Sequence, residues 1–246
     1  MLNRFRDFIA SEREQFSNEA NNTFAFCFSE IYRYFEFITI VFDRHKTYSK
    51  VFIDNFRTLQ KTYKTGSHPM TESQMKLHSE GRIITTNLQL EVESFYLFAK
   101  ILLDKAARAI EFYFGQTRKL PLDSHDDLTK NLESYSNARS LTILDELPHS
   151  ARKLKSDVSD YRDYYIAHEK SPRITRGTGF DGAGNIKIIH SKLYPKDNDK
   201  QIQTKHLNDL MTDITNYLNL VIQFIEINKS KTALKLNTKG IDINQK

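Results

Sequence analysis

Apolar residues recur along most of the chain at the spacing of an α-helix. Between residues 24 and 42 they follow one another at intervals of four and three, which places them on one helical face. The members of this stripe are Phe24, Phe28, Ile31, Phe35, Ile38 and Phe42. Residues 1–20 predict a short amphipathic helix, whereas the mixed pattern of residues 43–70 indicates a short helix or a packed loop.

The longest periodic stretch predicts a single helix from about residue 72 to 114. At 1.5 Å per residue such a helix is roughly 60 Å long. Thr71 and Gln74 have the spacing of a capping box, in which each side chain bonds the backbone of the other residue. Gly115 follows the last apolar position and is a natural C-terminal stop.

Three shorter helices are expected beyond Gly115. The first begins at Asp123 or Ser124 and runs to about Leu147, and Pro148 separates it from a second helix over about 150–169. Pro172 ends that second helix, because the residue before a proline avoids helical geometry. The last helix covers about 202–228 and is followed by a basic tail that we expect to be loose.

The period changes between these last two helices. Arg173–Arg176 and Ile186–His190 read as short strands, and half of the eight glycines lie between them. This pattern predicts a β-hairpin over about 173–192. It also explains the literal GxGxxG of residues 177–182, because in a dinucleotide-binding fold that motif precedes a helix rather than a second strand.

The predicted fold class is all-α: a helical bundle with one or two long helices and a short β-hairpin insertion. Residues 1–23 are expected to form an N-terminal helical extension, 24–228 the bundle and 229–246 a flexible tail. The single cysteine excludes an internal disulfide. The first residues lack the apolar core of a signal peptide, and the most apolar stretch contains three charges. A cytoplasmic protein with no membrane contact is the expectation.

Positive charge is concentrated late in the chain. Residues 151–205 contain twelve Lys or Arg and seven Asp or Glu, a net of +5 that equals the charge of the whole chain. A local excess of this kind suits a polyanion such as RNA, although an ordinary solvated surface has the same composition.

The basic region contains Arg162 and His168, separated by five residues near the end of a predicted helix. A guanidinium fits phosphate oxygens, and an imidazole exchanges protons near neutral pH. The spacing alone is weak, since about one such pair is expected by chance in this composition. A second pair, Arg118 and His125, spans the linker that contains Pro121. A surface Arg and a helix-end His remain the plain alternative.

The context of the first pair resembles the R-x(4–6)-H motif of the HEPN superfamily. Asp163 follows the Arg directly, where that family often has a polar residue, and the motif lies late in a helical chain before a final helix. The resemblance covers roughly residues 24–228 by pattern rather than by close identity. It implies a metal-independent endoribonuclease that acts as a homodimer, without a cofactor. It also implies partners such as an antitoxin or another defence-system protein.

In that interpretation the catalytic residues are Arg162, His168 and Asp163. His168 moves a proton, Arg162 stabilises negative charge on the phosphate, and Asp163 orients one of them. Tyr161 and Tyr165 are candidates for stacking on RNA bases, although packing is the more common role of such residues. Asp104 is a further candidate from the long helix, and no metal site is expected. The alternative function is a non-catalytic helical module that binds RNA or a partner protein.

Overall fold

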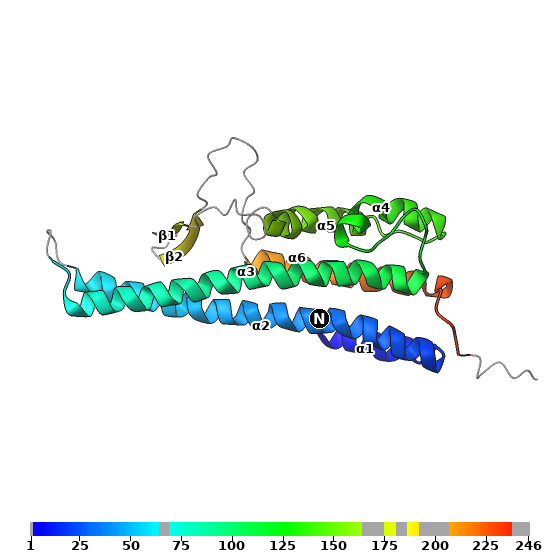
Figure 1. Ribbon diagram of the computed structural model, residues 1–246, viewed down its shortest axis with the longest axis horizontal. Coiled ribbons are helices and arrows are strands. Elements are labelled where there is room, and N and C mark those ends of the chain that lie inside the picture. Colours follow the sequence, from blue (N-terminus) through cyan, green and yellow to red (C-terminus); the bar gives the residue numbers. More distant parts are fainter. Residues whose placement is uncertain (1, 64–68, 164–174, 181–185, 192–206, 238–246) are drawn as a thin grey trace, which may run out of the picture. The chain divides into compact units, whose positions relative to one another are not determined.

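The computed structural model describes residues 2–63, 69–163, 175–180, 186–191 and 207–237. This part of the chain is predominantly helical, as predicted (Figure 1). The helices are α1 (Leu2–Arg13), α2 (Asn18–Thr62), α3 (Glu72–Phe114), α4 (His125–Ala138), α5 (Glu146–Leu154), the π-helix η1 (Lys155–Asp160), α6 (Leu207–Ile227) and the 3-10 helix η3 (Lys229–Lys231).

Two strands, β1 (Thr175–Phe180) and β2 (Ile186–Ser191), pair in antiparallel register with Thr175 opposite Ser191. The residues that connect them lie outside the described part of the chain. The expected hairpin insertion as a whole therefore stays a prediction.

The chain divides into two compact units, each built from separate segments. Unit 1 consists of Met1–Phe37, Phe98–Asp160 and Asn208–Lys246, and unit 2 of Ile38–Leu97 and Tyr161–Leu207. The sequence-based boundary at residue 23 falls inside α2, so the structure shows no division at that point.

Aromatic rings form one part of the core of unit 1. Phe24 of α2 lies 4.5 Å from Phe28 and 5.1 Å from Phe16 between ring centroids, and Phe16 lies 6.0 Å from Tyr113 of α3. In Figure 1, α1 runs beside the first part of α2, and Phe8 joins the cluster at 5.7 Å from Phe28. The apolar stripe of the sequence therefore packs as predicted.

The residues after α6 attach to this core. Leu236 forms an isolated antiparallel bridge with Phe16, and the Ala233 amide donates to the Tyr113 carbonyl at 2.9 Å. The Asn237 amide likewise donates to the Gln15 carbonyl at 2.8 Å. The stretch up to Asn237, which we expected to be loose, thus makes defined backbone contacts.

In unit 2, the later part of α2 and the first part of α3 lie antiparallel. Arg44 pairs with the buried carboxylate of Glu91, and the Phe42 and Phe95 rings lie 6.4 Å apart. The helices approach so closely at Gly81 that an added Cβ would lie 2.9 Å from Asn55 Oδ1.

Both predicted ends of the long helix α3 are confirmed. The Thr71 amide donates to Gln74 Oε1 at 2.8 Å, and the Gln74 amide donates to Thr71 Oγ1 at 3.3 Å, which is the predicted capping box. Gly115 has φ of +88° and donates its amide to the Glu111 carbonyl, as a C-terminal cap does.

Other boundaries were predicted wrongly. Helix α2 continues without a break to Thr62, where we expected a separate short helix or a packed loop over residues 43–70. Helix α4 ends at Ala138 rather than near Leu147, and Ser140 then adopts a left-handed φ of 55°. Pro148 lies within the first turn of α5, where its missing amide costs no intrahelical bond, so it does not separate two helices.

Candidate functional site

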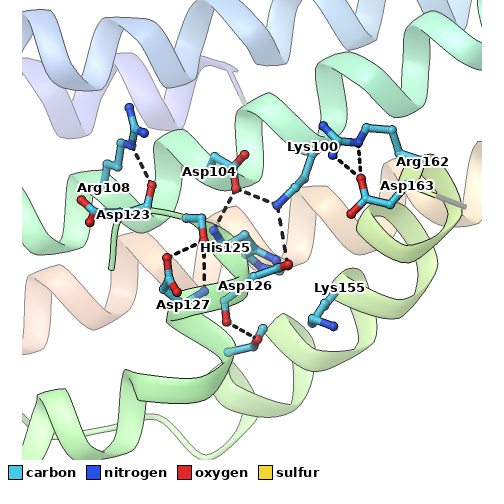
Figure 2. Close-up of polar contacts among 12 residues, drawn as sticks. Lys100, Asp104, Arg108, Asp123, His125, Asp126, Asp127, Lys155, Arg162 and Asp163 are labelled. Atoms are coloured by element: carbon cyan, nitrogen blue, oxygen red, sulfur yellow. Dashed lines mark hydrogen bonds and ion pairs between the residues drawn. The ribbon is translucent and has the colours of Figure 1, made fainter. Parts of the chain in front are cut away.

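The described part of the sequence motif is Arg162 and Asp163, which belong to unit 2. Arg162 Nε donates to Asp163 Oδ1 at 2.7 Å, and its Nη2 also contacts that oxygen (Figure 2). The Arg162 side chain is 28% exposed. Asp163 therefore holds one edge of a guanidinium that retains access to solvent.

His168 and Tyr165 lie outside the described residues. The distance between the imidazole and the guanidinium, and with it the geometry of the Arg–His pair, stays a prediction.

Tyr161 is a packing residue in this structure. Its side chain is buried, and its ring stacks on Tyr96 of α3 with centroids 4.1 Å apart and planes 21° from parallel. This was the alternative to base stacking in the sequence analysis, and a ring covered in this way presents little surface to a nucleobase.

The four basic side chains between residues 151 and 163 all have acidic neighbours. Arg152 pairs with Glu133 at 3.5 Å, Lys153 with Asp213 at 2.8 Å, Lys155 with Asp160 at 3.3 Å, and Arg162 with Asp163. In the described residues, the first part of the basic region is thus locally neutralised. For RNA to bind here, its phosphates would have to compete with these carboxylates, or the basic residues beyond Asp163 would have to provide the contacts.

A second polar cluster, which the sequence analysis missed, lies in unit 1. Lys100 of α3 is almost buried, with 7% of its side chain exposed, and its Nζ lies 2.9 Å from Asp104 Oδ1 and 3.6 Å from Asp126 Oδ1 (Figure 2). Asp104 Oδ1 also accepts the backbone amide of His125 at 2.8 Å. A lysine within the apolar run from Phe98 to Leu103 was the available sequence signal.

Asp104 makes contacts in this structure that the sequence analysis did not predict. It was a candidate for a role around the motif, but its described contacts tie α3 to the start of α4 within unit 1. These contacts indicate a structural role.

His125 is fully buried at the start of α4, and its ring lies edge-on to Tyr217 of α6 at 5.4 Å. Neither ring nitrogen has a hydrogen-bond partner among the described residues. Burial, helped by the charge of Lys100, lowers the pKa of His125 to about 3. The imidazole is thus neutral near pH 7 and is a poor proton donor there.

The described residues also bear on three other features: a metal site, a reactive thiol and a membrane-spanning helix. Among the described residues, no three His, Cys, Asp or Glu side chains gather in a way that would hold a metal ion. Burial raises the pKa of the Cys27 thiol to about 11, so it is protonated at neutral pH and a weak nucleophile. None of the described helices is both long and apolar enough to cross a membrane.

No family model matches the chain, and comparisons with curated proteins and with solved structures find no significant match.

Proposed function

We propose that this protein is a metal-independent endoribonuclease of the HEPN type, with Arg162 and His168 at its centre. The observation that supports this proposal best is the state of Arg162, whose guanidinium is partly exposed and held along one edge by Asp163. His168 follows after five residues in the sequence. A guanidinium fixed in this way is prepared for phosphate oxygens at little further cost in side-chain entropy.

The reaction is an attack of the ribose 2′-oxygen on the adjacent phosphorus. The 2′-oxygen–phosphorus bond forms, the bond from phosphorus to the 5′-oxygen breaks, and the products are a 2′,3′-cyclic phosphate and a 5′-hydroxyl. His168 accepts the 2′-hydroxyl proton or delivers a proton to the leaving oxygen, which is worth typically 10²–10⁴ in rate. Arg162 stabilises the charge that develops on the phosphoryl oxygens.

The proposed enzyme is a homodimer. With the α-helical spacing that the sequence predicts for the motif, Arg162 and His168 would lie about 120° apart around the axis and about 9 Å apart along it. A single copy encloses a phosphate poorly, whereas two copies about a two-fold axis bring both pairs to one cleft. An antitoxin or another defence-system protein is the proposed regulatory partner, in the cytoplasm.

The test is cleavage of a set of RNAs by purified protein in the presence of a chelator, with the ends of the products identified. We expect wild-type protein to yield cyclic phosphate ends and His168→Ala protein to lose at least a hundredfold in rate. His149→Ala is the matched control, because His149 is exposed on α5 and outside the motif. Equal cleavage by wild-type and His168→Ala protein would rule out the enzyme.

A non-catalytic module that binds RNA or a partner protein is the second candidate. The paired state of the four basic residues between 151 and 163 favours the protein-binding form of this module, because paired cations attract a polyanion such as RNA weakly. This alternative predicts RNA or protein binding without cleavage, and binding that His168→Ala leaves intact.

A further inference from the structure

Helix α3 carries apolar residues on two sides within unit 2. The side that faces α2 contains Leu88 and Phe95, which are fully buried. On another side Ile83, Leu90 and Leu97 are 59%, 53% and 43% exposed. Leu88 and Leu90 are two positions apart, which corresponds to about 200° around a helix axis. The exposed residues therefore form a second apolar face that α2 does not cover.

This second face has a regular spacing. Ile83, Leu90 and Leu97 are each seven positions apart, and seven residues make almost two complete turns of a helix. Thr86 lies on the same face, three positions after Ile83 and four before Leu90, and it is also exposed. A repeat of seven is the pattern by which two helices pack along their length.

A charged residue lies toward each end of the face. Arg82, which is exposed, precedes Ile83, and Glu93, which is half-buried, lies one turn before Leu97. The ion pairs described in unit 2 join other residues, and the described contact of Glu93 is a hydrogen bond from the Gln89 amide at 2.8 Å. The face is therefore positive near its start and negative near its end.

We propose that this face of α3, from residue 79 to 97, binds the same face of a second copy of the chain, with the two helices antiparallel. With the two-fold axis between residues 87 and 88, Arg82 of each copy lies level with Glu93 of the other. Ile83 and the other copy's Leu90 are then within about 3 Å of each other along the axis. A parallel pair would instead place like charges opposite each other, so the charges select the antiparallel arrangement.

This inference goes beyond the proposed function, because self-association of unit 2 does not require RNA cleavage. Each copy contributes only three large apolar side chains, Ile83, Leu90 and Leu97, and their neighbour Thr86 is polar. Such a contact belongs to the small class of interfaces, which are weak. The expected dissociation constant is on the order of micromolar.

The test is sedimentation equilibrium of the full chain over a range of micromolar concentrations. We expect wild-type protein to be in monomer–dimer equilibrium. Leu90→Glu should raise the dissociation constant at least about tenfold, because it places a charge in the apolar contact with Ile83 of the other copy. Val51→Glu is the matched control, since Val51 is a 45% exposed apolar residue on α2 of the same unit. It should leave the dissociation constant unchanged.

Exchange of the two charges tests the antiparallel register. Arg82→Glu and Glu93→Arg should each raise the dissociation constant about three- to tenfold, since each replaces two attractive pairs by two repulsive ones. The double variant, Arg82→Glu with Glu93→Arg, should return close to the wild-type value, because the pairs form again with their signs exchanged. If Leu90→Glu protein does not fold, these three variants decide the question.

Three results would each overturn the proposed surface: a wild-type protein that stays monomeric, an unchanged dissociation constant for Leu90→Glu, or no rescue in the double variant. Cleavage assays separate this outcome from the proposed function. If association follows these expectations but wild-type protein does not exceed His168→Ala protein in cleavage, the enzyme fails and the surface stands. If cleavage requires His168 while Leu90→Glu associates normally, the surface fails and the enzyme stands.

Discussion

The Lys100 cluster of unit 1 and the Arg162 segment of unit 2 each place a cation beside a carboxylate. They differ in solvent access: Lys100 is 7% exposed and shared by two aspartates, whereas Arg162 is 28% exposed and paired with the residue next to it. The histidine of the first cluster, His125, is buried and neutral. A buried cluster of a cation and carboxylates thus stabilises the fold, whereas a partly exposed one remains accessible to a substrate.

Substitution of Arg162 is expected to have the largest effect, and it tests the difference between the two clusters. Arg162→Ala should reduce RNA cleavage by about 10²–10³, because the charge on the phosphoryl oxygens loses its main donor. Arg162→Lys should recover only part of the rate, since lysine lacks the planar fork. Steady-state cleavage rates measure the loss, and thermal unfolding should show little change. A large loss of stability would instead place Arg162 with the structural cluster.

The opposite result is expected at Lys100. Lys100→Met leaves Asp104 and Asp126 without their shared cation, and removing one partner from such a pair costs about 3 kcal/mol. Denaturant unfolding measures this loss. Lys76→Met is the control, because Lys76 is exposed on α3. A Lys100→Met protein that is as stable as wild type would contradict the structural role of the cluster.

The buried imidazole of His125 makes stability depend on pH. Its pKa is lowered to about 3 from an ordinary value of 6.5, so the unfolded chain binds a proton below pH 6.5 that the folded chain does not. This contribution to stability is complete above pH 6.5 and is lost as the pH falls toward 3. Between pH 6.5 and 5 the loss should be on the order of 2 kcal/mol.

The measurement for His125 is the free energy of unfolding at several pH values. His125→Gln has no titrating group at this position, so its unfolding curve should be flatter in this range than that of wild type. Equal pH dependence of the two proteins would show that His125 is not responsible.

A smaller effect is expected at the start of α3, in the same unit as Arg162. Thr71→Ala removes the hydroxyl that accepts the Gln74 amide and should cost about 1 kcal/mol. Thr71→Ser should retain the cap. Chemical denaturation measures the cost, and cleavage at temperatures well below the unfolding transition should be unchanged. If Thr71→Ala reduced cleavage, a loss of stability in unit 2 would be sufficient to explain the reduced cleavage of the Arg162 variants.

The sequence was sufficient for α3 because its signals agree. An unbroken apolar stripe, the Thr71–Gln74 capping box and Gly115 all indicate the same bounds. The later half of α2 was missed, because its residues are mixed in polarity and it is supported by contacts with α3, such as Arg44 with Glu91. The pattern of apolar and polar residues within one segment does not reveal contacts with a distant segment, so a helix that such contacts stabilise is easily missed.

The polar groups were harder to assign from the sequence. Lys100 and Asp104 have the spacing of a helical ion pair, but nothing local indicates that Asp126 also reaches Lys100. The π-helix depends on how Val158 and Ser159 are both buried, which three-dimensional packing determines. The sequence therefore supplies the candidate Arg162–His168 pair but leaves its surroundings undetermined.

We propose that two copies of the chain join their Arg162 and His168 side chains around one phosphodiester. The most direct measurement is a crystal structure of the dimer with an RNA whose reactive 2′-hydroxyl is replaced by hydrogen. We predict that His168 of one copy lies close to the substituted 2′ position and that Arg162 contacts the phosphate in the same cleft. His168 side chains buried in separate monomers, or exposed on opposite faces of the dimer, would contradict this shared site.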